Sequence, residues 1–284
     1  MKISDLPLSQ PLFSFEVFPP KPTVDMQQIY TALDGMATLR PDFISVTFGA
    51  GGGTNNQKTV EITSEVKRRF GIEGVAHLPG IHLSELDVLR ILDDFRAHGI
   101  ENILALRGDP SVDTAPVGRF RHADELITFI REHGDFHIMA ACYPEGHPES
   151  HDLFSDLYHL KGKVEAGADH LITQLFLDND TFYTFREACA RRRIHVPIEA
   201  GIMPITAVSQ IDRIIRLSGI RLPKHFENRV LTFADDPIAF RAAGIEFAVR
   251  QIRDLLREGV DGIHLYTMNK PDIAQEIVSA VRAG

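Results

Sequence analysis

Cysteine, basic runs and long apolar runs are all scarce in this sequence. Among 284 residues there are only two cysteines, Cys142 and Cys189, and they do not form a CxxC pair. Neither a disulfide framework nor a structural zinc knuckle is indicated, which is typical of a reducing, cytoplasmic location. The net charge is −9 without any Lys/Arg-rich segment, which argues against nucleic acid or an anionic membrane as the main partner. No run of about 18 apolar residues is present, so we expect no transmembrane helix, and the first residues carry no secretion signal.

Several catalytic motifs are also missing. The sequence contains no HExxH, which argues against that type of zinc enzyme, and we expect no metal site. It contains no Gly-x-Ser-x-Gly elbow, and Cys142 has no activating partner nearby in sequence, so a nucleophilic hydrolase is disfavoured. No Gly-Lys-Ser/Thr follows the glycine-rich segment Gly49–Thr54, which excludes a Walker loop.

Short apolar segments alternate with segments of helical periodicity along the whole chain. Eight strand-like segments can be recognised, and each is followed by a predicted helix: 12–18, 43–48, 74–79, 102–107, 137–143, 170–176, 198–204 and 262–268. Such alternation requires parallel pairing with helical crossovers. Eight units without a linker predict a single (β/α)₈ TIM barrel, an α/β fold, over residues 1–284. The rival is a doubly wound open sheet, which would normally show a glycine fingerprint after its first strand, where Glu16 and Pro19-Pro20 stand instead.

Polar side chains stand near the carboxyl ends of these predicted strands. The stretch Leu104–Pro110 is typical, because a buried strand runs into Arg107, Gly108 and Asp109. In a barrel, the carboxyl ends of the strands form one mouth, where active sites lie. The corresponding residues of the other strands are Glu16, Thr47, His77, Tyr143 with His147, Gln174 and Tyr266. We therefore predict one shared site.

The chemistry of these side chains suggests an organic ligand. Glu16 lies in an aromatic run, and a carboxyl in apolar surroundings can act as an acid near neutral pH; an outward-facing strand residue is the simpler alternative. His77, Tyr143, His147 and Gln174 lack zinc-type spacing, and Tyr143 and Gln174 suit stacking and hydrogen bonding to a ring.

Two further segments could bind a phosphate-containing ligand. Backbone amides of Gly49–Thr54 could approach a phosphate or a flat cofactor, or the segment is simply a βα loop. Asp156 and Lys163 are seven residues apart on one helix and share a face. They could contact a ribose or a diphosphate, or form a solvated charged surface.

An ordered set of short motifs resembles the bacterial, FAD-dependent methylenetetrahydrofolate reductase family, catalytic barrel only. The motifs span nearly the whole chain: Ser14–Lys21, Ser45–Gly52, Ala105–Asp109, Tyr143–Glu149, Lys161–Ala168, Ile172–Phe176 and Gly201–Pro204. The resemblance implies a (β/α)₈ barrel that binds FAD and folate. It also implies ping-pong reduction of 5,10-methylenetetrahydrofolate to 5-methyltetrahydrofolate with NADH or NADPH, in one-carbon metabolism and methionine biosynthesis, and a homo-oligomer.

The resemblance also implies roles for individual residues. Glu16 would be the general acid that helps to open the five-membered ring of the folate to an iminium, and Asp109 would lie between flavin and pterin. Gln174, Tyr266 and Lys270 would contact the substrate with them. The residues implied to hold FAD are Thr47, His77, Arg107, Gly108, Asp109, Ala141, Tyr143, His147, Asp156 and Lys163.

The chain departs from the family pattern at three places. Phe48 replaces a typical tyrosine, and Asn55, Asn56 and Gln57 replace charged residues after the glycine loop. The aromatic clamp of the family aligns best with Val230, with Phe226 or Phe233 as substitutes. The choice between NADH and NADPH therefore stays open. Two alternatives also remain: a folate-dependent methyltransferase barrel, and a flavin- or folate-binding subunit that needs a partner for electrons.

Overall fold

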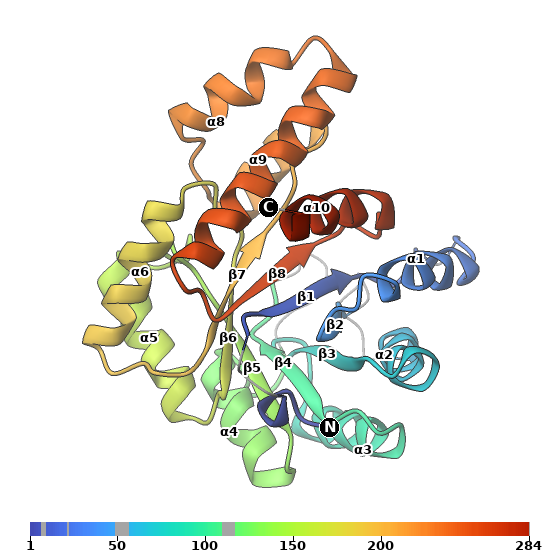
Figure 1. Cartoon of the computed structure of the whole chain (residues 1–284). Helices are drawn as coiled ribbons and strands as arrows, with labels where there is room; N and C mark the ends of the chain where they lie inside the picture. The colour runs from blue at the N-terminus through green and yellow to red at the C-terminus, as the bar shows by residue number, and fades with distance from the viewer. Residues whose placement is uncertain (7–9, 22, 49–56, 110–116, 284) are drawn as a thin grey trace.

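The structure is a computed structural model that describes residues 1–6, 10–21, 23–48, 57–109 and 117–283 of the chain. Eight parallel strands form a closed barrel in sequence order, and β8 pairs with β1 (Figure 1). The strands are β1 (Leu12–Val17), β2 (Phe43–Val46), β3 (Glu73–Pro79), β4 (Asn102–Leu106), β5 (His137–Cys142), β6 (His170–Thr173), β7 (Ile198–Ile202) and β8 (Gly262–Tyr266). The predicted (β/α)₈ barrel is confirmed, and the open-sheet alternative is wrong.

Helices surround the barrel and cover the outer faces of the strands (Figure 1). They are α1 (Gln27–Ala37), α2 (Gln57–Phe70), α3 (Glu85–Ala97), α4 (Ala123–His133), α5 (Leu153–Glu165), α6 (Asn179–Arg191), α7 (Ile211–Ser218), α8 (Lys224–Arg229), α9 (Pro237–Arg257) and α10 (Pro271–Ala283). Three short 3₁₀ helices complete the described elements: η1 (Ile3–Asp5), η2 (Val208–Gln210) and η3 (Leu231–Phe233). Among the described helices, none is long and apolar enough to cross a membrane.

Local sequence signals set several helix starts. The side chain of Ser84 accepts a hydrogen bond from the amide of Asp87, and the Asp87 carboxylate accepts one from the amide of Ser84. This is the predicted capping box, which satisfies amides that have no partner within the helix. Asp152 caps α5 in a similar way, and Pro237 occupies the first turn of α9, where it has no intrahelical hydrogen bond to lose.

The strands have two kinds of buried face. Residues that point outward, such as Phe15, Ile44 and Ile263, pack with the helices in the main apolar core. Residues that point inward include Ser14, Ser45, His77, Glu199 and His264, all of which are buried polar side chains. The barrel interior is therefore partly polar directly below the mouth.

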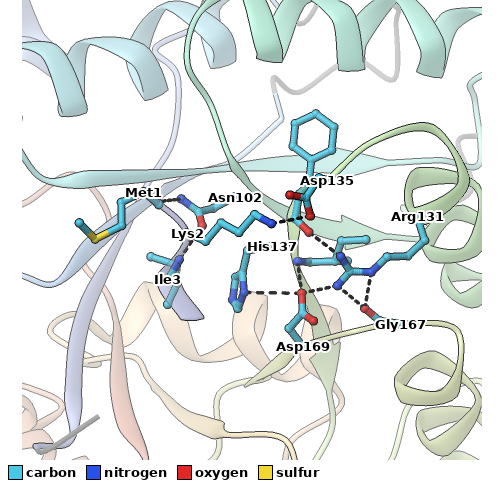
Figure 2. A network of polar contacts seen from close by, with 11 residues as sticks. Met1, Lys2, Ile3, Asn102, Arg131, Asp135, His137, Gly167 and Asp169 are labelled. Atoms are coloured by element: carbon cyan, nitrogen blue, oxygen red, sulfur yellow. Dashed lines mark hydrogen bonds and ion pairs between the residues drawn. The ribbon is translucent and has the colours of Figure 1, made fainter. Parts of the chain in front are cut away.

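The amino end of the barrel is closed by a segment that the sequence did not predict to be structured. Ile3 of η1 is 1% exposed and belongs to an apolar cluster with Phe43, Leu104 and Met139 inside the strands. Its amide donates to the Oδ1 atom of Asn102 at 2.8 Å, and Lys2 pairs with Asp135 (Figure 2). This plug separates the barrel interior from solvent at the end opposite the mouth.

A separate apolar cluster supports the region after β7. Phe226 and Val230 of the α8 region pack with Phe240, Ile205 and Leu177. In Figure 1, α8 and the start of α9 project beyond the ring of helices. The cluster fixes this projecting part on the barrel.

Candidate active site

The parallel closed barrel brings the predicted strand-end residues to one end of the molecule. Glu16 pairs in register with Tyr266 of β8 and with Ser45 of β2. Arg107 and Tyr143 directly follow β4 and β5. The residues therefore meet at a common mouth, as expected where the carboxyl ends of all strands face the same way.

Glu16 points into the barrel rather than into the aromatic run that flanks it in sequence. Strand alternation directs Phe15 to the outer core, where it is fully buried. The Oε2 atom of Glu16 lies 3.6 Å from Nε2 of His77 and 4.0 Å from Nε2 of His264. Two imidazoles thus lie close to the carboxyl of the candidate acid.

His77 lies one layer below the rim. It pairs in register with Leu104, whereas β3 continues to Pro79. Burial lowers the pKa of His77 to about 4, with His264 acting in the same direction and Glu16 opposing it. The imidazole is therefore neutral near pH 7, and its Nε2 atom has no hydrogen-bond partner among the described residues.

Arg107 makes an ion pair that the sequence did not reveal. Its guanidinium binds the carboxylate of Glu149 through both terminal nitrogens, one at 2.9 Å. The pair raises the pKa of Arg107 and lowers that of Glu149. Gly108 has φ of 85°, and a Cβ atom there would lie 2.9 Å from Cβ of Pro79, so the turn needs glycine. Asp109 is exposed, and its backbone carbonyl contacts Nε2 of His82 at 3.2 Å.

A second group lies beside β5. The ring of Tyr143 packs edge-on against His147 at 4.6 Å, and the ammonium of Lys163 lies 6.0 Å from the same ring. Lys163 donates to the carbonyl of Ala141 at 2.9 Å. Burial lowers the pKa of Lys163, and Asp156 opposes this shift. The shared face predicted for Asp156 and Lys163 therefore points inward, not to solvent.

The remaining predicted residues lie at other strand ends. Gln174 uses its side-chain oxygen to accept from the amide of Leu175 at 2.8 Å. The hydroxyl of Tyr266 donates to the carbonyl of Thr173 at 2.7 Å. Thr47 is half-buried just after β2, and Lys270 is exposed after β8. Thr47 and Gln174 directly follow β2 and β6, whereas the side chain of Tyr266 reaches over β7 to β6.

The three candidates for the aromatic clamp differ in exposure. Val230 and Phe226 are 0% and 1% exposed and belong to the cluster that supports α8. Phe233 is 42% exposed. Of the three, it is the only side chain free to meet a ligand without disrupting a core.

Other predicted features lie outside the described residues. These are the loop Gly49–Thr54, together with Asn55, Asn56 and Pro110. Within the described ranges, no cluster of three or more histidine, cysteine or acidic side chains could hold a metal ion. A surface cavity of about 530 Å³ exists elsewhere, between α5 and the end of α6, lined by Tyr158, Lys161 and Arg191 among others. It contains none of the predicted site residues.

Sequence reasoning missed five polar residues of this region: Ser14, Ser45, Glu149, Glu199 and His264. All except Glu149 lie within strands, at positions directed into the barrel. Their one sequence signal is a polar residue inside an otherwise apolar strand, which is unusual where both faces of a strand are buried.

Comparison with known proteins identifies the family. Residues 2–282 match the family model described as methylenetetrahydrofolate reductase. The chain is 35% identical to a 5,10-methylenetetrahydrofolate reductase of Pectobacterium carotovorum over 93% of this chain and 88% of that protein. It is 34% identical to the enzyme of that name from Escherichia coli, with the same coverage. It is 36% identical to methylenetetrahydrofolate reductase 1 of Schizosaccharomyces pombe, over 98% of this chain and 48% of that longer protein.

Solved structures agree on the fold alone. A Clostridium thermocellum protein described as binding two copies of 5-methyl-5,6,7,8-tetrahydrofolic acid superposes with a TM-score of 0.64 and 11% identity, covering 96% of this chain and 94% of that one. A Coxiella burnetii dihydropteroate synthase superposes with a TM-score of 0.52 and 12% identity, covering 97% and 93%. The family assignment rests on the sequence matches, and by these the chain belongs to the methylenetetrahydrofolate reductase family.

Proposed function

We propose that this protein reduces 5,10-methylenetetrahydrofolate to 5-methyltetrahydrofolate, with FAD as its cofactor and NADH or NADPH as the electron donor. The observation that carries the proposal is family membership over residues 2–282 together with a carboxylic acid, Glu16, in the mouth of the barrel. The same mouth would receive the nicotinamide and then the folate in turn, which is ping-pong behaviour.

The donor set beside β4 and β5 fits FAD. Arg107 and Lys163 supply two cations suited to a diphosphate. Asp156 can accept from ribose hydroxyls, and Tyr143 with His147 offers ring faces and edges. Gly108 lets the backbone approach closely at the end of β4. We assign these residues, with Thr47, His77, Asp109 and Ala141, to the flavin; when bound, FAD supplies the hydride that the folate receives.

The protein's own residues would bind the folate and supply a proton. Glu16, beside His77 and His264, would donate a proton to the ring nitrogen that leaves when the five-membered ring opens. Asp109, exposed at the rim, would bind the pterin, and Gln174, Tyr266 and Lys270 would complete the folate site. Each of these groups stands at a strand end or in the turn that follows it.

The test is the absorption spectrum of the purified protein followed by two anaerobic half-reactions. A bound flavin should show the oxidised flavin spectrum, and NADH or NADPH should bleach it. Methylenetetrahydrofolate should then restore the colour and yield methyltetrahydrofolate. A colourless protein that still transfers a methyl group from folate would point to the methyltransferase alternative. A bound flavin that is reduced by neither NADH nor NADPH would point to a subunit that needs an electron-donating partner.

A further inference from the structure

A group of buried polar side chains lies inside the barrel below Glu16. Ser14, Ser45, Glu199 and His264 are all 0% exposed, and His170 is 2% exposed. Glu199 is the second residue of β7, a strand whose other residues are apolar or glycine. Burying a carboxylate costs free energy unless it is paired, so its partners indicate its role.

The hydrogen bonds of Ser14 have a defined direction. Its Oγ atom lies 2.6 Å from Oε2 of Glu199, 2.7 Å from Nδ1 of His264 and 3.4 Å from the carbonyl of Ile263. A hydroxyl has one proton, and a carboxylate can only accept. The short, charge-assisted contact to Glu199 takes that proton in preference to the long contact to Ile263. Ser14 must then accept a hydrogen bond from Nδ1–H of His264.

Glu199 is held in the ionised form that this direction requires. Burial alone would raise its pKa, but the neighbouring His170 and the hydrogen bond from the Ser14 hydroxyl help to lower the pKa below its ordinary value. The Nε2 atom of His170 lies 3.1 Å from Oε1 of Glu199. Asp42 and Tyr266 also interact electrostatically with Glu199, and the ring of His137 lies 6.0 Å from the ring of His170.

The far side of His264 faces the candidate acid. A neutral imidazole with its proton on Nδ1 has a lone pair on Nε2. That atom lies 3.4 Å from Oγ of Ser45 and 4.0 Å from Oε2 of Glu16. The other titratable groups facing Glu16 are His77 at 3.6 Å and Tyr266. A lone pair at this place can accept a hydrogen bond from a protonated carboxyl, whereas an N–H would favour the carboxylate.

We propose that Glu199 is a positioning residue for the acid: through Ser14 it holds His264 in the Nδ1–H tautomer and so presents a lone pair to Glu16. The proposal rests on the proposed function only in assigning Glu16 as the proton donor. Glu199 thereby favours the protonated form of Glu16, the form that can donate. The separation of 4.0 Å would shorten when the folate fills the mouth, as such contacts do in enzyme–substrate complexes.

The tautomer of His264 can be measured without any reaction. The chain is labelled with ¹⁵N-histidine, and long-range ¹H–¹⁵N spectra are recorded at pH 7.5 for wild type and Glu199→Gln. His264→Gln identifies the signals of His264. Wild type should show Nδ1–H, and Glu199→Gln should lose it, because an amide NH₂ can donate to Ser14 and reverse the hydrogen bond. An Nε2–H tautomer in wild type, or an unchanged tautomer in the variant, would overturn the proposal.

Two further variants make the result secure. Ser14→Ala removes the connecting hydroxyl but leaves Glu199 beside His170, so it should also lose the single tautomer; it decides the matter if Glu199→Gln does not fold. Glu73→Gln is the matched control, because Glu73 is a partly buried glutamate at the amino end of β3 that pairs with Lys67. It should leave the signals of His264 unchanged, and a change there as large as in Glu199→Gln would overturn the specific role of Glu199.

The catalytic consequence is read from the folate half-reaction. In Glu199→Gln the protonated form of Glu16 is stabilised less. The rate of folate reduction at pH 7.5 should therefore fall about tenfold, and the pH profile of that rate should move about one unit toward acid. Flavin reduction by NADH or NADPH should stay within about twofold. A merely structural role would lower stability without moving the pH profile, and that result would overturn the proposal. If wild type itself binds no flavin or does not reduce folate, the proposed function fails while the tautomer result stands.

Discussion

The hydroxyl of Tyr266 on β8 reaches over β7 to donate a hydrogen bond to the carbonyl of Thr173 on β6, 2.7 Å away, and Gly201 of β7 leaves room for the ring. A Cβ atom on Gly201 would lie 2.2 Å from the same carbonyl oxygen and 2.8 Å from Cε2 of Tyr266. The first of these is a backbone atom of the neighbouring strand and cannot move aside without distorting the barrel.

Gly201→Ala should therefore destabilise the protein by about 2–4 kcal/mol. Tyr266→Phe, which removes only the hydrogen bond, should cost about 0.5–1.5 kcal/mol. Urea denaturation followed by circular dichroism measures both. Gly162→Ala is the matched control, because the nearest atom to its Cβ is 3.8 Å away and the position is within α5. That variant should be neutral or slightly stabilised; an equal loss in all three variants would contradict the steric explanation.

The features that could be predicted are those that depend on residues close together in the sequence. The strand and helix pattern and the Ser84 capping box follow from local periodicity and side-chain chemistry, and the structure confirms them. Which way Glu16 points could not be predicted, because strand periodicity gives two faces without saying which one is inside. Phe13 and Phe15 suggested apolar surroundings, yet alternation places them on the opposite face.

Partners that are distant in the chain were not predictable from one sequence. Glu199 meets Ser14 across 185 positions, and Glu149 meets Arg107 across 42. Only barrel closure and the loop after β5 bring these residues together. His77 lies two residues before the end of β3, which ends at Pro79 as the predicted segment 74–79 does.

The proposed acid can be tested by separating the two half-reactions. Glu16→Gln keeps the size of the side chain but cannot donate a carboxyl proton. It should lower the rate of folate reduction about a hundredfold or more and leave flavin reduction by NADH or NADPH within about twofold. Stopped-flow absorbance of the flavin measures each step. An equal loss in both half-reactions would show that Glu16 is needed for flavin binding rather than for proton donation.

Asp109 should show a different selectivity. It is exposed at the rim, its backbone carbonyl contacts His82, and its carboxylate interacts electrostatically with Arg107 and Tyr143. Asp109→Asn should therefore weaken folate turnover about tenfold or more through lost binding of the pterin, while the flavin remains bound. The flavin content after gel filtration and the KM for folate are the two readouts. Loss of flavin from the purified variant would contradict the assigned position.

The ion pair between Arg107 and Glu149 predicts opposite roles for its two members. If Arg107 binds the flavin diphosphate, Arg107→Gln should weaken flavin binding about tenfold or more, because a charge-assisted contact is lost. Glu149 competes for the same guanidinium, so Glu149→Gln should bind flavin as tightly as wild type or more tightly. Fluorescence titration of the apoprotein with FAD measures both. Equal weakening in both variants would indicate that the intact pair, rather than free Arg107, forms the site.

Substitution by alanine should distinguish the exposed Phe233 from the buried Phe226 near the projecting helices. Phe226→Ala should destabilise the fold by about 3–5 kcal/mol, because it leaves a cavity in the cluster around α8. Phe233→Ala should change stability by less than about 1 kcal/mol. If Phe233 replaces the aromatic clamp, this second variant should raise the KM for NADH or NADPH in the flavin half-reaction. Unchanged kinetics in Phe233→Ala would leave the chain without that clamp.

Acid should destabilise the protein partly through His77. Its pKa is about 4 in the folded protein and about 6.5 when unfolded, so between these values only the unfolded chain takes up the proton. The contribution of His77 to the free energy of unfolding should thus be fully present above pH 6.5 and decrease as the pH drops toward 4. Between pH 7 and pH 4.5 the loss from this one group is about 2 kcal/mol. In urea titrations across this range, His77→Gln should show a smaller loss than wild type by about that amount. His195→Gln, which removes an exposed histidine, should follow the wild-type slope; a His77→Gln slope equal to both would mean that folding does not lower the pKa of His77.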